Sequence, residues 1–269
     1  MRVRYVLVAL AVAATLSGCL QFETIITVDR DGSGAVEQTF LMNNEILAML
    51  QGMASETSDE ELTLLDVDEL RAEAEAMGEG VRFVSAEAVE TDWGQGYIAL
   101  FEFDDINTLR VNQNPGDNLP DSASTGEEPI EENLTFELVD GTPATLVIRL
   151  PDEPTEPSEN DDADRSDDGG AAMQSNDEMN EMLRQFYADM RMMIAVEVDG
   201  RVVSTNATYR EGSRITLMDL DFNAILENPE ATERLLQNEA QSVSDLQVLS
   251  AMVPGVRIET VDPVRIRFR

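Results

Sequence analysis

Carboxylates are the reactive side chains that this chain carries in quantity. Its 269 residues include 54 Asp and Glu against 18 Lys and Arg, with no His, for a formal net charge of -36. All the cations are arginine, so the chain offers neither an imidazole for general-base work nor an amine for a Schiff base. Its one thiol is Cys19. Because the negative charge repels phosphate backbones, we expect no nucleic-acid partner.

The sharpest local pattern of oxygen donors is the DRDGSGAV segment that begins at Asp29. Asp29, Asp31 and Ser33 match the first, third and fifth positions of an EF-hand loop, which would suit Ca²⁺. However, Phe40 stands where that loop needs a bidentate glutamate, and the flanking residues favour strands. The simpler interpretation is a hairpin turn in which Asp and Gly supply the special backbone angles. We therefore expect no cofactor, with Ca²⁺ bound by Asp29, Asp31 and Ser33 as the alternative.

A second group of polar side chains lies nearer the C-terminus. Asp219 and Asp221 are two residues apart and thus on one face of a strand, and Asn206 lies in a strand expected nearby. Paired carboxylates can hydrolyse glycosidic bonds. Such pairs also arise by chance in so acidic a chain, and Asp221 can equally cap a helix. We take the three residues as a candidate partner face, assign no catalytic residue and expect no enzyme; a carboxylate-based hydrolase is the less favoured alternative.

The N-terminus has the layout of an export signal. Arg2 and Arg4 precede an apolar run of eleven residues, from Tyr5 to Thr15. At about 1.5 Å per helical residue, this run is too short to cross a ~30 Å hydrocarbon core, as is typical of a cleaved signal. It ends in Leu16, Ser17, Gly18 and Cys19, a sequence that resembles the lipobox of bacterial lipoproteins.

The lipobox resemblance implies cleavage before Cys19 and a diacylglycerol on its thiol, so that the lipid attaches the chain to a membrane. Leu20 follows the cysteine, where an aspartate would be the usual signal for retention in the inner membrane. The sequence therefore favours a place in the bacterial cell envelope, at the outer membrane.

The elements that must position these residues form an α+β pattern. Hairpin signals dominate and βαβ crossovers are not evident, so we expect a mainly antiparallel sheet with helices packed on one face. The other face would be left to solvent or a partner. The expected strands are 22–28, 36–42, 81–91, 97–104, 134–139, 144–150, 192–198, 201–210, 214–218, 256–261 and 264–268. The expected helices are 43–53, 58–77, 177–190 and one or two within 229–250.

We divide the chain into a signal peptide, residues 1–18, and an extracytoplasmic α+β domain in two parts, 19–150 and 178–269. Between the parts, residues 151–177 are rich in proline and aspartate. Self-repulsion and the lack of bulky side chains predict a disordered segment there. It either links two domains or is an insertion between elements of one sheet, and we favour the insertion.

Four features together resemble the poorly characterised bacterial envelope lipoproteins of the LppM-like kind. They are Cys19 in its lipobox, an Asp-Gly-Ser-Gly turn soon after it, a strand pair at 196–207 and a short strand ending near Asp221. The resemblance implies a β-rich domain on a lipid anchor and carries over no catalytic residue. We expect a non-enzymatic binding or assembly component that offers a sheet face or groove to an envelope protein, a lipid or a glycan. The alternative is a divalent-cation-binding or adhesion module built on the Asp29–Gly34 loop.

Overall fold

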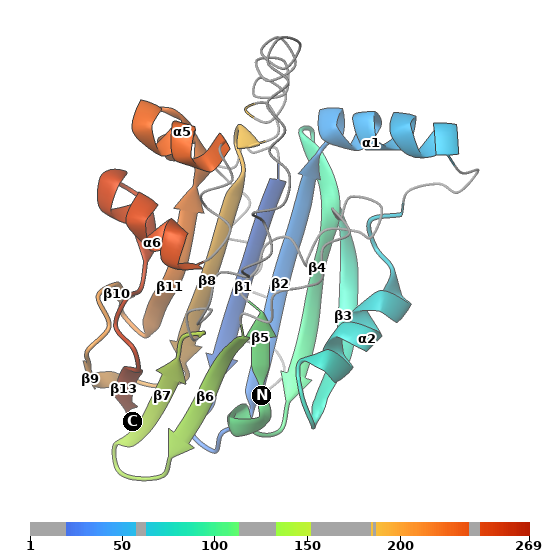
Figure 1. Cartoon of the computed structure of the whole chain (residues 1–269). Helices are drawn as coiled ribbons and strands as arrows, with labels where there is room; N and C mark the ends of the chain where they lie inside the picture. Colours follow the sequence, from blue (N-terminus) through green and yellow to red (C-terminus); the bar gives the residue numbers. More distant parts are fainter. Residues whose placement is uncertain (1–19, 58–62, 113–132, 152–183, 185–186, 237–242) are drawn as a thin grey trace, which may run out of the picture.

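Two β-sheets packed face to face form the body of the molecule (Figure 1). The computed structural model describes residues 20–57, 63–112, 133–151, 184, 187–236 and 243–269. The mixed α+β class expected from the sequence is confirmed. None of the helices in these residues combines the length and the apolar character needed to cross a bilayer.

The larger sheet has eight strands in the order β10-β11-β8-β1-β2-β4-β3, and β12 also pairs with β11. Its strands are β1 (Leu20–Val28), β2 (Gly34–Asn43), β3 (Val81–Glu90), β4 (Gly94–Phe103), β8 (Arg191–Val198), β10 (Arg210–Glu211), β11 (Arg214–Asp221) and β12 (Arg257–Ile258). The five-stranded sheet has the order β5-β6-β7-β13-β9. Its strands are β5 (Arg110–Asn112), β6 (Asn133–Val139), β7 (Ala144–Arg149), β9 (Val202–Thr205) and β13 (Val264–Phe268).

Strands from before and after residues 152–183 are present in both sheets. In the larger sheet β1 pairs with β8 in parallel, while the other described pairs are antiparallel. The predicted disordered segment 151–177 lies outside the described residues, except for Pro151.

Of the expected meander of 192–198, 201–210 and 214–218, the hairpin turn at Glu211–Gly212 between β10 and β11 is present, but the pairing of 192–198 with 201–210 is wrong. β8 has β1 on one side and β11 on the other, so neither of its edges is free for the strand that follows it. After Asp199, whose amide donates to the carbonyl of Val28 at 2.9 Å, the chain crosses to the five-stranded sheet. There β9 pairs with β13.

The described helices are α1 (Asn44–Thr57), α2 (Val67–Ala76), η2 (Ile106–Thr108), α4 (Phe222–Leu226), α5 (Pro229–Leu236) and α6 (Val243–Met252). The expected helix 58–77 starts later than predicted, because Asp66 is its N-cap. Asp66 is extended, and its carboxylate accepts from the amides of Asp68 at 2.8 Å and Glu69 at 3.3 Å. Of the expected helix 177–190, residues 177–183 and 185–186 lie outside the description.

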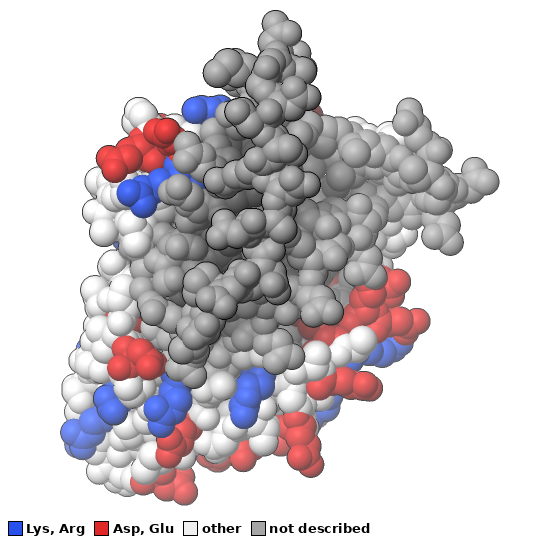
Figure 2. All heavy atoms as spheres, viewed as in Figure 1, with Lys and Arg blue, Asp and Glu red and all other residues white. Residues whose placement is uncertain are grey.

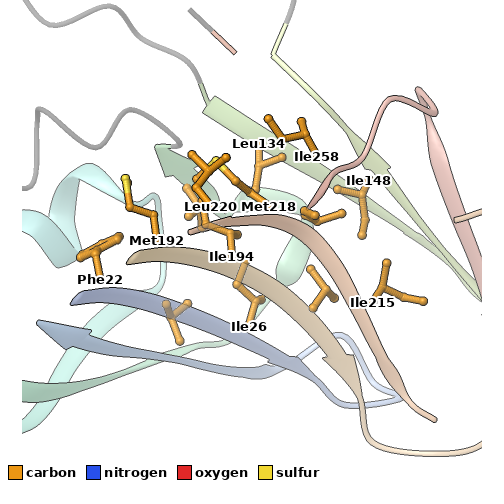
Figure 3. Close-up of a cluster of buried hydrophobic side chains, with 14 of the residues drawn as sticks. Phe22, Ile26, Leu134, Ile148, Met192, Ile194, Ile215, Met218, Leu220 and Ile258 are labelled. Carbon is orange, nitrogen blue, oxygen red and sulfur yellow. The ribbon is translucent and has the colours of Figure 1, made fainter. Parts of the chain in front are cut away.

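The core lies between the two sheets and follows from the alternation of apolar residues along the strands. Figure 3 shows Ile26, Ile194 and Ile215 of the larger sheet facing Leu134 and Ile148 of the smaller one. Each of these side chains is at most 1% exposed. Burying an aliphatic side chain of this size contributes roughly 2 kcal/mol. Because side chains alternate between the two faces of a strand, burial of these residues makes their neighbours along the same strands face outward.

Candidate functional site

The lipobox Leu16, Ser17, Gly18 and Cys19 lies outside the described residues, which begin at the next residue, Leu20. Leu20 is the first residue of β1 and pairs with Met42 near the end of β2. Asn43 pairs in turn with Gly94, and Asp221 pairs with Arg191 at the start of β8. We call this edge of the larger sheet the Leu20 end.

Two further features lie at the Leu20 end. Helix α1 follows β2 directly and lies across the tops of the strands in Figure 1. The amide of Asn44 in α1 donates to the carbonyl of Trp93, in the turn between β3 and β4, at 2.9 Å. Trp93 is the one tryptophan of the chain. The residue that would carry the lipid is therefore next to an end of the sheet that also holds a helix and an aromatic turn.

The outer face of the larger sheet points away from the core and from α2. Along β1 and β2, Phe22, Ile26 and Val36 are buried against the core, so Glu23 and Glu37 between them point outward. We call the outward surface around Glu23 and Glu37 the acidic face. It also holds aliphatic residues, Ile25, Ile98, Leu100 and Met193, each only partly buried.

The pKa values of Glu23 and Glu37 are both raised, and burial is the main cause in each case. Arg214 acts against the rise at both carboxyls, and Arg191 does so at Glu23. Within the part of the chain that the structure describes, neither carboxylate has an ion pair or a side-chain hydrogen bond.

The two nearby arginines have partners of their own. Arg191 lies 3.1 Å from Asp219 and Arg214 lies 3.4 Å from Glu197, so their charges are largely satisfied. The acidic face therefore combines aliphatic surface with two central carboxylates that form no ion pair among the described residues, although Arg191 and Arg214 lie near enough to act on their pKa values.

The Asp29–Gly34 loop is a hairpin turn between β1 and β2. The amide of Asp29 donates to the carbonyl of Ser33 at 2.8 Å. The carboxylate of Asp31 accepts from both the amide and the hydroxyl of Ser33, at 3.1 Å and 2.6 Å. These bonds hold the pKa of Asp31 below its usual value.

Asp29 has the opposite environment. Its pKa is raised, first by burial and then by the charges of Asp199 and Asp31. Among the described residues, no group of three or more acidic, cysteine or histidine side chains is placed to hold a metal ion. The three predicted Ca²⁺ ligands, Asp29, Asp31 and Ser33, thus lie in one turn, where the Asp31 carboxylate already accepts two hydrogen bonds from Ser33.

The structure separates the three residues of the candidate partner face. Asn206 lies beside the five-stranded sheet, where its side chain donates to the carbonyl of Pro263 at 3.0 Å and accepts from the amide of Arg265 at 2.6 Å. Asp219 and Asp221 lie on β11 of the other sheet. Asp219 accepts from Arg191, and Asp221 caps α4 through the amide of Asn223 at 3.0 Å. Each side chain has a structural partner, and their role as a partner face stays a prediction.

A buried polar contact between α2 and the larger sheet was not expected from the sequence. Gln38, 4% exposed on β2, donates to the carboxylate of Glu73 on α2 at 2.7 Å. Burial raises the pKa of Glu73, and the bond from Gln38 opposes the rise. Burial, with the nearby Glu73 and Glu69 charges, also raises the pKa of Tyr97. The available signal was a glutamate in the middle of a helix whose neighbours Leu70 and Ala74 are apolar.

Comparisons with known proteins add little. No protein-family model and no curated protein matches the chain. One similar solved structure is the NMR structure of the folded domain of LppM from Mycobacterium tuberculosis, 13% identical, covering 77% of this chain and 85% of that one, with a TM-score of 0.29. Another is a substrate-bound M1 zinc metallopeptidase from Deinococcus radiodurans, 14% identical, covering 77% of this chain and 40% of that one, with a TM-score of 0.24. Neither likeness is close enough to support an argument.

Proposed function

We propose that this chain is a lipid-anchored component of a bacterial cell envelope, with its lipid on Cys19, and that it acts by binding another envelope molecule rather than by catalysis. The acidic face carries the proposal. A sheet surface with partly exposed aliphatic residues around two carboxylates can bury apolar area against a docked partner and offer it strong hydrogen-bond acceptors.

The anchor supports the same function. Because Leu20 begins β1, the Cα of Cys19, the residue proposed to carry the lipid, is one step of about 3.8 Å from the Cα of the first residue of the sheet. The Leu20 end would then rest at the membrane, and the acidic face would stand sideways to it, open to neighbours in the same membrane. Leu20 in place of an aspartate favours the outer membrane.

Replacement of the lipid acceptor tests the anchor. In a bacterial host, Cys19→Ala is expected to move the protein from the membrane fraction to the soluble fraction, because the lipid is the attachment. The matched control Ser17→Ala keeps a small residue in the lipobox and is expected to leave the protein in the membrane. Membrane retention of Cys19→Ala would contradict the proposal.

A photo-crosslinking residue tests the binding role. Thr39 pairs with Glu23 across β1 and β2 and shares the acidic face, whereas Ala72 is exposed on α2. A crosslinker at position 39 is expected to give one discrete product in intact membranes, and the same group at position 72 is expected to give none. Equal diffuse labelling from both positions would exclude the acidic face as a binding surface.

A cation-binding module on the Asp29–Gly34 loop is the second candidate. The observation in its favour is the raised pKa of Asp29 beside the charges of Asp199 and Asp31, since a bound cation would relieve that repulsion.

A further inference from the structure

The outward surface of the five-stranded sheet is rich in arginine, although the chain as a whole is acidic. On β13, Val264, Ile266 and Phe268 are fully buried, so Arg265 and Arg267 between them point away from the core. The same outward surface receives Arg149 from β7 and Arg110 from β5, both exposed. We call the surface formed by Arg110, Arg149, Arg265 and Arg267 the arginine face.

The strand register fixes these arginines as one surface. Arg265 is paired with Val147, which is paired with Glu137, and Arg149 is paired with Thr135, the partner of Arg110. Glu137 is the acidic residue inside this pattern, 3.5 Å from Arg149. Figure 2 shows basic side chains over the lower part of this side of the molecule, with acidic side chains between them. The excess of arginine gives the surface a local positive potential.

The two outward surfaces of the molecule are complementary in charge. The acidic face has Glu23 and Glu37 at its centre, with no ion pair to either among the described residues, and the arginine face has Arg265 and Arg267 at its centre. They belong to the two sheets on opposite sides of one core (Figure 1). A two-fold contact would place like charges against like, whereas a front-to-back contact places each face against its complement.

The anchor makes the front-to-back arrangement geometrically simple. Both faces run along their strands, and the Leu20 end is at right angles to them. Copies stacked front to back therefore keep all their Leu20 ends on one side, toward one membrane. The arginine face itself is a poor membrane surface in this setting, because Leu20 belongs to the other sheet, about 10 Å behind.

The net charge of the chain opposes contact between copies, but this repulsion is limited in range. At physiological salt, charges separated by more than about 8 Å are largely screened, whereas the facing side chains approach more closely than that. Attachment to one membrane also raises the effective concentration of copies.

From these observations we propose that the arginine face of one copy docks on the acidic face of a second copy, so that lipid-anchored copies form rows on the membrane. The proposal rests on the proposed function, because it names the partner of the same acidic face and uses the same anchor.

Engineered cysteines test the contact in membranes of cells that make the full chain. Thr39→Cys places a thiol on the acidic face, and Thr145→Cys, opposite Arg267, places one on the arginine face. With a short bis-maleimide, cells that make both single variants are expected to give a cross-linked dimer, and each variant alone is expected to give none. The double variant is expected to give a ladder of dimers, trimers and longer products.

Charge reversal tests the chemistry of the contact. Arg265→Glu with Arg267→Glu in the Thr145→Cys chain is expected to lower the cross-linked fraction roughly tenfold, because like charges then face each other. Glu23→Arg with Glu37→Arg in the Thr39→Cys chain is expected to restore it. Arg30→Glu with Arg71→Glu, which reverses two exposed arginines outside the arginine face, is the matched control and is expected to leave cross-linking unchanged. If the Glu23→Arg and Glu37→Arg changes prevent the protein from accumulating in cells, Glu23→Gln and Glu37→Gln can replace them. These milder changes are expected to restore part of the cross-linked fraction.

Each contrary outcome is decisive. Cross-linking of one single-cysteine variant with itself would show a two-fold contact and overturn the proposal, as would no dimer from the pair or no effect of the reversals. A discrete product of Thr39 with a different protein would overturn the proposal and leave the proposed function standing. Wild-type protein whose Cys19 reacts with maleimide would instead contradict the lipid anchor, because a lipidated thiol is blocked.

Discussion

At the scale of single residues, Glu73 is a half-buried carboxylate with a structural partner. It belongs to α2 and accepts a hydrogen bond from Gln38 of β2 at 2.7 Å, and burial raises its pKa from an ordinary value of 4.5. The unfolded chain therefore ionises this group at lower pH than the folded chain does. Its contribution to stability is lost as pH rises from about the ordinary value through the raised value, and the loss is complete above it.

Glu73→Gln removes this titration while keeping an oxygen that accepts from Gln38. We expect a higher melting temperature at pH 7 than in the wild type, and a flatter dependence of melting temperature on pH just above 4.5. Glu75→Gln, at an exposed position of the same helix, is the control. Thermal unfolding followed by circular dichroism across this range measures both. A wild-type slope in Glu73→Gln would show that Glu73 is not the group responsible.

A substitution of Asp29 distinguishes the two interpretations of the Asp29–Gly34 loop, a simple hairpin turn or a Ca²⁺ site. If the loop binds Ca²⁺, the ion is expected to raise the melting temperature of the wild type, and Asp29→Ala is expected to remove that rise. Arg30→Ala, at the exposed neighbouring position, controls for the change in the turn itself. The measurement is thermal unfolding with and without Ca²⁺. An equal rise in the wild type and in Asp29→Ala would exclude the loop as the site.

The candidate residues show which contacts a sequence reveals. The Asp31 and Ser33 bonds span two residues and follow from local turn chemistry, so the hairpin could be predicted. The contact of Gln38 with Glu73 spans 35 residues, and it depends on where α2 packs. The placement of Asn206 depends on its strand leaving one sheet for the other. Such long-range choices leave no local pattern to read.

At the scale of elements, hairpins were predictable and their assembly was not. The pairs β1–β2, β3–β4 and β6–β7 each join neighbouring runs of strand-forming residues across a short turn, as the sequence predicts. The parallel pair of β1 with β8 brings together strands separated by more than 150 residues, and only global packing selects it. The alternation of arginine and apolar residues in β13 marks an outward basic surface, but its neighbours Arg149 and Arg110 become visible only once the strand order is known.

The five-stranded sheet also explains why the helices cover less of the larger sheet than we expected. We expected helices to pack on one face of a single sheet, and instead the five-stranded sheet occupies most of that face, with α2 beside it (Figure 1). The same packing leaves two outward sheet surfaces instead of one. Opposite charges on these surfaces are the basis for the front-to-back contact.

At the scale of the whole molecule, the anchor and the two faces define an orientation. The proposed lipid on Cys19 would bring the Leu20 end to the membrane, while the turn between β6 and β7 lies at the other end of the molecule (Figure 1). The strands would then stand steeply on the membrane surface, with the acidic and arginine faces directed sideways. A molecule lying flat on its arginine face would place β6 and β7 at the lipid instead.

Trp93 can report this orientation, because it is the one tryptophan of the chain and lies in the turn that contacts α1 at the Leu20 end. In vesicles that carry the lipidated protein, lipids with a quencher at the headgroup level are expected to quench Trp93 fluorescence, as for tryptophans at a membrane interface. The control variant combines Trp93→Phe with Val139→Trp, which moves the probe to an exposed position before the β6–β7 turn. We expect little quenching there. Stronger quenching at position 139 than at position 93 would show that the protein lies on the five-stranded sheet, and the rows built on sideways faces could not form.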